Sequence, residues 1–193
     1  MLNIKQLLFI LGILLSMMAG FMCLPLVFAL LHGEETAGAF MLSLLTGTVA
    51  SICIKSGKRH HLTLNIRDMF LLTSLTWFIV SLFAAMPFTL YHGINYTDAF
   101  FETMSGVTTT GSTVLSGLDK MDLAILMWRS LLQWLGGIGF IVMAVAILPF
   151  LNVGGMKLFR TESSDWGDKA VPRTRSMAKD LFWVYFLLTV FCA

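Results

Sequence analysis

Uncharged apolar runs of membrane-spanning length constrain the fold of this chain more than any other feature. The first run, residues 7–31, contains no Asp, Glu, Lys or Arg. A helix needs about 20 apolar residues to cross the hydrocarbon core of a bilayer. Further runs at residues 36–54, 69–91 and 123–151 are long enough to do so. The sequence therefore predicts an all-α, polytopic transmembrane protein, since helices satisfy their own backbone hydrogen bonds in lipid.

The composition excludes several other classes of protein. Charged residues make up 12% of the chain and hydrophobic residues 57%, whereas soluble domains carry about 25% charge and 45–50% apolar residues. The three cysteines lie in apolar runs without a CxxC pair. His60 and His61 have no further ligand at helical spacing, so neither a disulfide framework nor a zinc site is expected. No GxGxxG fingerprint follows a strand pattern, which argues against dinucleotide binding.

The distribution of positive charge predicts the orientation of the spans. Eleven of the 13 Lys and Arg residues lie at the N-terminus, between residues 55 and 67, or between residues 157 and 179. Because Lys and Arg collect on the cytoplasmic side, these three segments are assigned to the cytoplasm. Residues 92–122 then begin and end on the outer side of the membrane.

A short helix is expected inside that outer region, over residues 95–106. Asn95 or Thr97 is suited to cap its start, and Gly106 to end it. At about 1.5 Å per residue, such a helix reaches only half way across a bilayer. A half-length helix followed by a polar stretch between two full spans is typical of a re-entrant loop. Residues 107–113, VTTTGST, then either line a pore or form an outer turn.

The polar stretch has the chemistry of a cation filter. Extended backbone with its carbonyls on one side replaces the water around a monovalent cation, and a glycine permits the dihedrals that this requires. Thr108, Thr109, Thr110 and Gly111 fit these needs. The segment holds no Asp or Glu, so K⁺ is favoured over a divalent cation. The alternative is a Thr- and Gly-rich extracellular turn.

Two other sets of residues are candidates for supporting roles. Glu102 and Arg129 are intramembrane charges, which are costly unless paired. We expect them to form an ion pair that supports the pore helix; the alternative is that Arg129 extends to the outer interface. Gly136, Gly137 and Gly139 either form a hinge in the fourth span or permit close helix packing.

Two stretches and the spans before them resemble a known family. Residues 98–119, DAFFETMSGVTTTGSTVLSGLD, and residues 129–160, RSLLQWLGGIGFIVMAVAILPFLNVGGMKLFR, are similar to Trk-type potassium uptake subunits (the TrkH/TrkG family, in a superfamily with Ktr and HKT transporters). The resemblance covers essentially the whole chain. It implies potassium transport without enzymatic activity or a covalent cofactor, with K⁺ as the transported ion and Thr109 and Thr110 as its nearest contacts.

The resemblance also implies a domain organisation of membrane–pore–membrane repeats. Residues 1–62 would form two extra helices, residues 63–151 the first repeat, residues 152–180 a cytoplasmic connector, and residues 181–193 the start of a second repeat. One loop cannot surround an ion, so either four copies assemble or the chain is the N-terminal part of a longer protein. The 13 apolar residues at the end are too few to span, which favours the second alternative.

Partners and location follow from the same resemblance. It implies a bacterial inner-membrane protein with a cytoplasmic N-terminus, a TrkA-like nucleotide-binding regulatory subunit in the cytoplasm, and a homo-oligomer of the full-length form. Nucleic acid is not an expected partner. Transport along the gradient and symport with another ion both stay open. A small homotetrameric cation channel is one rival, and a non-conducting chain that binds only a regulator or a full-length subunit is another.

Overall fold

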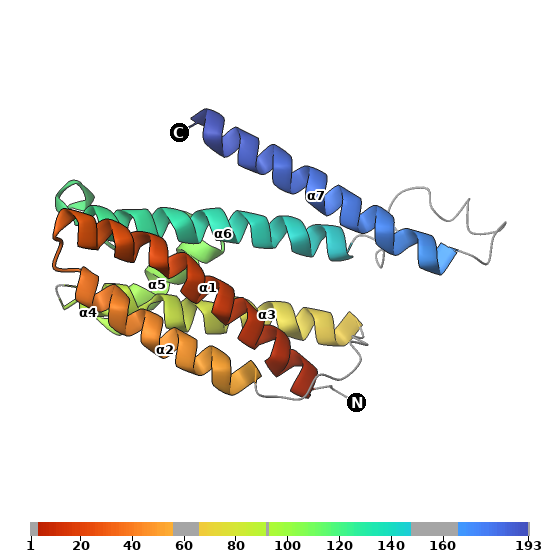
Figure 1. Ribbon diagram of the computed structural model, residues 1–193, viewed down its shortest axis with the longest axis horizontal. Helices are drawn as coiled ribbons and strands as arrows, with labels where there is room; N and C mark the ends of the chain where they lie inside the picture. The colour runs from red at the N-terminus through yellow and green to blue at the C-terminus, as the bar shows by residue number, and fades with distance from the viewer. Residues whose placement is uncertain (1–3, 56–65, 92, 148–165, 193) are drawn as a thin grey trace. The chain divides into compact units, whose positions relative to one another are not determined.

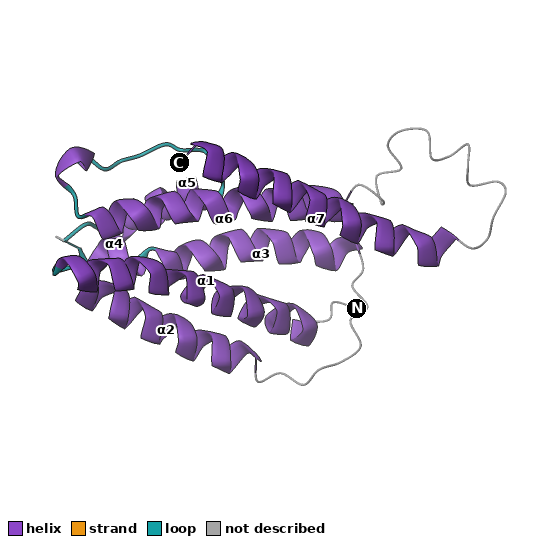
Figure 2. Ribbon diagram, turned by 45° about the horizontal axis from the view of Figure 1, so that its top comes forward, coloured by secondary structure: helices purple, strands orange, loops and turns teal. Residues whose placement is uncertain are grey.

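The computed structural model describes residues 4–55, 66–91, 93–147 and 166–192, and every regular element among them is a helix (Figures 1 and 2). The helices fall into two compact units, residues 1–135 and residues 136–193, which are described separately. The predicted all-α membrane fold is confirmed. Among the described residues, three helical stretches are long and apolar enough to cross a membrane: Gln6–His32, Phe70–Leu90 and Leu123–Val142.

The first unit begins with a hairpin of two helices, α1 (Ile4–His32) and α2 (Ala37–Lys55), which lie side by side in Figures 1 and 2. Gly33 follows α1 with φ +68°, a left-handed conformation that commonly ends helices and is easiest for glycine. The two helices pack together at Gly47, where an added Cβ would meet the Ala19 Cβ in ordinary contact at 3.7 Å. The apolar part of α2 among the described residues, Ala37–Ile52, is shorter than the three stretches above.

The third predicted span is broken near its outer end into α3 (Ile66–Ala84) and α4 (Met86–Leu90). Pro87 stands in the first turn of α4, where its fixed φ suits a helix start and its missing N–H is not needed. Helix α3 therefore ends with carbonyl groups that no longer have a full set of helical donors.

Side chains of later helices donate hydrogen bonds to carbonyls at this end of α3. The Tyr96 hydroxyl donates to the carbonyl oxygen of Leu82 at 3.0 Å, and Trp128 Nε1 donates to that of Ala84 at 3.1 Å. Thr103 Oγ1 lies 3.0 Å from the carbonyl oxygen of Ser81, which still accepts the amide of Ala85 as well. The break in the span thus creates the place where the short helix and the next long helix attach.

The expected short helix is present as α5 (Tyr96–Val107). Its 12 residues rise about 18 Å at 1.5 Å per residue, well below the ~30 Å of a hydrocarbon core. Asn95 occupies the N-cap position without a side-chain capping bond, and the helix ends at Val107, one residue beyond the expected Gly106. Ala99, Glu102, Thr103 and Gly106 are buried at helical spacing and define the face that packs inward.

A single 3₁₀ turn, η1 (Leu118–Lys120), precedes the long helix α6 (Leu123–Ile147). Within the first unit α6 packs against the hairpin through two aromatic contacts. Trp128 meets Phe40 edge to face with ring centroids 6.4 Å apart, and Trp134 meets Phe21 at 6.3 Å. The predicted end of this span, residues 148–151, lies outside the described residues.

The second unit contains the remainder of α6 and helix α7 (Trp166–Cys192). Helix α7 begins inside the predicted connector 152–180, whose first part, residues 152–165, lies outside the described residues. Exposed apolar side chains crowd its C-terminal half, including Phe182, Trp183, Leu187 and Phe191. This exposure agrees with a helix that meets lipid or other membrane helices.

Candidate functional site: the loop after α5

The residues predicted to form a filter lie in the irregular segment that follows α5, drawn in teal in Figure 2. Thr108 is the C-cap of α5, with φ −79° and ψ 0°. Thr109 then adopts φ +59° and Gly111 φ +76°. The left-handed conformation is usual for glycine but rare for a β-branched residue. Instead of running straight on, the chain turns back on the end of the helix.

The amide groups of Thr108–Gly111 all bond to the C-terminal carbonyls of α5. The amide nitrogen of Thr108 lies 2.9 Å from the carbonyl oxygen of Met104, and that of Thr109 lies 2.9 Å from Gly106. The amides of Thr110 and Gly111 share the carbonyl oxygen of Ser105, at 2.9 and 3.4 Å. These bonds use the helix-end acceptors that would otherwise lack partners.

The carbonyl groups are displayed in the opposite direction. In a trans peptide the C=O points away from the N–H of the same unit, so the carbonyls preceding these four amides point away from α5. Among the described residues, no donor meets the carbonyl oxygens of Thr108, Thr109 or Thr110. All three residues are exposed in this chain. The segment therefore offers a short row of unpaired carbonyl oxygens.

The threonine hydroxyls have different surroundings. Thr108 Oγ1 donates to the carbonyl oxygen of Met104 at 2.8 Å and lies 2.9 Å from Thr110 Oγ1. The side chain of Thr108 is thereby hydrogen-bonded to the end of α5 and to the hydroxyl of Thr110. The backbone of this segment, more than its hydroxyls, supplies the free oxygens.

Ser105 closes the turn from inside, and it was not among the predicted site residues. Its hydroxyl donates to the carbonyl oxygen of Ser112 at 2.6 Å, while its own carbonyl accepts the amides of Thr110 and Gly111. No spacing rule marks a serine near a helix end for this role, because the bond depends on how the chain turns afterwards.

Glu102 and Arg129, expected to pair, lie in contact. Arg129 Nε donates to Glu102 Oε1. The other carboxylate oxygen of Glu102 accepts from Thr113 Oγ1 at 2.9 Å and from the amide of Val114 at 3.2 Å. The Glu102 side chain is 1% exposed and that of Arg129 19%. The buried carboxylate of Glu102 thus connects α6 to the later part of the loop, at Thr113 and Val114. These two contacts were not among the predictions.

Helix α6 supports the loop at two further points. A Cβ at Gly106 would lie 3.2 Å from the Leu132 Cβ, a separation tighter than ordinary contact, so glycine favours this close approach of α5 and α6. A Cβ at Gly111 would lie 4.0 Å from Gln133 Nε2. Arg129, Leu132 and Gln133 thus lie on one face of α6, and this face packs against the loop and the end of α5.

The three candidate glycines of the fourth span lie within the continuous helix α6. Gly136 is buried, Gly137 half-buried and Gly139 exposed. A Cβ at Gly137 would lie 2.5 Å from the hydroxyl oxygen of Tyr185 on α7, so a side chain at this position would require Tyr185 to move. This contact within the second unit favours close packing at Gly137, and a hinge role for the group stays a prediction.

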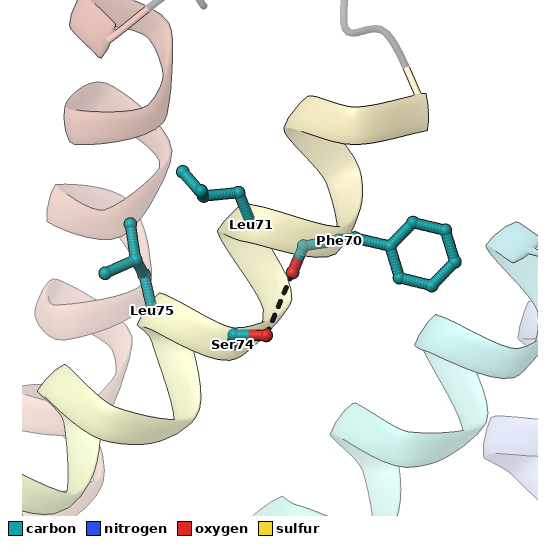
Figure 3. Close-up of a pocket in the computed structure, with 4 residues that line it drawn as sticks. All are labelled: Phe70, Leu71, Ser74 and Leu75. Carbon is teal, nitrogen blue, oxygen red and sulfur yellow. Dashed lines mark hydrogen bonds between the residues drawn. The ribbon is translucent and has the colours of Figure 1, made fainter.

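Other candidate sites offer less chemistry. The part of the chain that the structure describes holds no group of three His, Cys, Asp or Glu residues able to bind a metal ion, and His60 and His61 lie outside it. A surface hollow on α3 is lined by Phe70, Leu71, Ser74 and Leu75 (Figure 3). Its only hydroxyl, that of Ser74, donates to the carbonyl oxygen of Phe70 at 3.2 Å, as the dashed line in Figure 3 shows.

Comparison with known proteins decides the family. Residues 39–193 match the TrkH family, described as cation transport proteins. This chain belongs to the TrkH family. The resemblance expected from the sequence is confirmed, and it holds for the fold as well. The crystal structure of the potassium transporter TrkH from Vibrio parahaemolyticus superposes with a TM-score of 0.83 at 35% identity, covering 98% of this chain and 38% of that one.

Relatives of the TrkH family agree with this assignment. The Trk system potassium uptake protein TrkI of Halomonas elongata is 42% identical over 186 residues, which are 95% of this chain and 38% of that protein. The Trk system potassium uptake protein TrkH of Escherichia coli strain K12 is 41% identical over 189 residues, 95% of this chain and 39% of that protein. The chain thus spans less than half the length of the TrkH-family relatives it matches.

Proposed function

We propose that this chain contributes one selectivity-filter loop to a TrkH-type potassium transport protein, with Thr108–Gly111 facing the ion. The observation that carries the proposal is the orientation of the loop backbone. The amides of Thr108–Gly111 are bonded to the end of α5, and the carbonyl oxygens of Thr108, Thr109 and Thr110 point away from α5 and meet no donor in the part of the chain that the structure describes. Carbonyl oxygens in this arrangement replace the hydration shell of K⁺.

The electrostatics of the loop suit a monovalent cation. The C-terminal end of α5 carries negative partial charge and lies directly behind the loop. Residues 107–113 contain no carboxylate, and the nearby carboxylate of Glu102 is engaged by Arg129, Thr113 and Val114. Backbone dipoles, with no formal negative charge, therefore face the ion. Transport of this kind breaks no covalent bond, so the proposal includes neither catalytic residues nor a covalent cofactor.

In this proposal α5 is a re-entrant pore helix that enters the membrane from the outer side. The Lys and Arg distribution supports a cytoplasmic N-terminus, and the family supports the bacterial inner membrane. About four such loops are needed to encircle K⁺, supplied by further repeats or by further copies. A TrkA-like cytoplasmic subunit would meet the basic segment 157–179, and the full-length form would be a homo-oligomer.

The test uses a chimeric transporter that contains this chain. The matching part of Escherichia coli TrkH, 41% identical over 189 residues, is replaced by this chain, and K⁺ uptake is measured in a strain that lacks its own K⁺ uptake systems. Gly111→Asp is compared with Gly117→Asp, because both glycines are left-handed, at φ +76° and +72°. We expect the chimera to take up K⁺, Gly111→Asp to abolish uptake and Gly117→Asp to retain it. Equal loss in both variants, or an inactive parent chimera, would contradict the proposal.

A further inference from the structure

We propose that Glu34, in the connection between α1 and α2, is a positioning residue for the loop after α5. The inference rests on the proposed function of that loop. Glu34 lies outside the residues that match the TrkH family, 39–193, and it belongs to the N-terminal hairpin and not to the predicted first repeat, residues 63–151. Its carboxylate holds the start of α6, the helix that backs the loop.

The connection holds Glu34 in a fixed place. Its amide donates to the carbonyl oxygen of Ala29 at 2.9 Å, and its own carbonyl accepts the amide of Ala37 at 3.3 Å. The hydroxyl of the buried Thr36 donates to Glu34 Oε2 at 3.3 Å. Both the backbone and the side chain of Glu34 are therefore held by hydrogen bonds within or next to the connection itself.

The same carboxylate oxygen accepts the amide of Ala124 at 3.1 Å. Ala124 is the second residue of α6, and the first amides of a helix lack acceptors within the helix. A carboxylate at this end is also favoured by the partial positive charge of the helix N-terminus. Ala124 is fully buried in the folded chain, so its amide relies on Glu34 and not on water as its acceptor. The acceptor for this amide comes from a residue 90 positions away.

Fixing the start of α6 fixes the residues that touch the loop. Arg129 stands five residues after Ala124, about 7.5 Å along the axis, and binds Glu102. Leu132 packs against Gly106, and Gln133 lies beside Gly111. A shift or rotation of the first turns of α6 would move all three contacts together. Glu34 thus links the hairpin, through α6, to the oxygens that are proposed to select the ion.

The first test uses this chain alone in detergent micelles. Amide hydrogen exchange is measured for Glu34→Ala, for Glu34→Gln, which keeps an acceptor oxygen, and for Glu35→Ala as a matched control. Glu35 is the adjacent acidic residue and is exposed. We expect Glu34→Ala to speed exchange about tenfold at Ala124, the scale of one lost hydrogen bond to a charged group, and to speed exchange at Thr109–Gly111. Glu34→Gln should stay within about threefold of the parent, and Glu35→Ala should match it.

The second test uses the Escherichia coli TrkH chimera and separates positioning from folding. Glu34→Ala should raise the KM for K⁺ uptake several-fold with little change in maximal rate per molecule, and Glu34→Gln should restore the KM. A role in folding alone would lower the amount of protein and leave KM unchanged, which would overturn the inference. Unchanged exchange at Thr109–Gly111, or an equal effect of Glu35→Ala, would also overturn it. An inactive parent chimera would refute the proposed function, while the exchange measurement, which needs no transport, would still decide whether Glu34 holds the loop.

Discussion

Removal of the Arg129 side chain should expose how strongly the loop depends on one buried carboxylate. Glu102 is 1% exposed, and in Arg129→Ala its charge would keep only the donors Thr113 Oγ1 and the amide of Val114. Leaving one partner of a buried ion pair alone destabilises a protein by about 3–5 kcal/mol. Glu102→Gln should destabilise less, by about 1.5–3 kcal/mol, because the amide still accepts a hydrogen bond and Arg129, at 19% exposure, is not sealed from solvent.

The decisive variant is the double substitution. Once Glu102→Gln has removed the charge, Arg129→Ala leaves no buried ion behind. The double variant should therefore have a larger free energy of unfolding than Arg129→Ala alone. The coupling between the two substitutions should be about 0.5–3 kcal/mol. Reversible unfolding in mixed micelles of dodecylmaltoside and SDS measures all three variants. Lys120→Ala removes an exposed basic residue and should change stability by less than about 0.5 kcal/mol. Additive effects of the two substitutions would refute the pairing argument.

Three further substitutions test the packing around the loop, each by unfolding in the same micelles. Thr109→Gly should stabilise the chain by up to about 1 kcal/mol, because relief of ~1–2 kcal/mol of left-handed strain exceeds the ~0.5–1 kcal/mol entropic penalty of glycine; destabilisation would show that Thr109 is unstrained. Gly106→Ala should destabilise by about 1–3 kcal/mol through overpacking, whereas Gly38→Ala, with open space around it, should not. Trp128→Phe should cost about 1–3 kcal/mol, since the buried carbonyl of Ala84 loses its indole donor; a cost below ~0.5 kcal/mol would argue against that bond.

Much of the fold is predictable from the sequence because lipid imposes simple length rules. The uncharged run at residues 7–31 corresponds to α1, and the short helix before VTTTGST corresponds to α5. The break between α3 and α4 is harder to foresee. Pro87 is visible in the sequence, but the donors that reach the carbonyls of Leu82 and Ala84, Tyr96 and Trp128, come from other helices. Such partners become known only when the packing is known.

The site shows the same division between local rules and long-range contacts. Thr108–Gly111 could be singled out because their residue types suit a carbonyl filter, and Glu102 and Arg129 because unpaired charge is costly in a membrane. The left-handed conformation of Thr109 could not be predicted, since β-branched residues disfavour it. The bond from Glu34 to Ala124 joins residues 90 positions apart and follows no sequence period.

The most direct measurement of the central claim is the position of a bound ion. Crystals of the Escherichia coli TrkH chimera grown with Tl⁺ in place of K⁺ would show the ion by anomalous scattering. We expect a peak on the side of the loop to which the carbonyl oxygens of Thr108, Thr109 and Thr110 point, away from the end of α5. A peak elsewhere in the pore, with these carbonyls bonded to protein donors, would contradict the account.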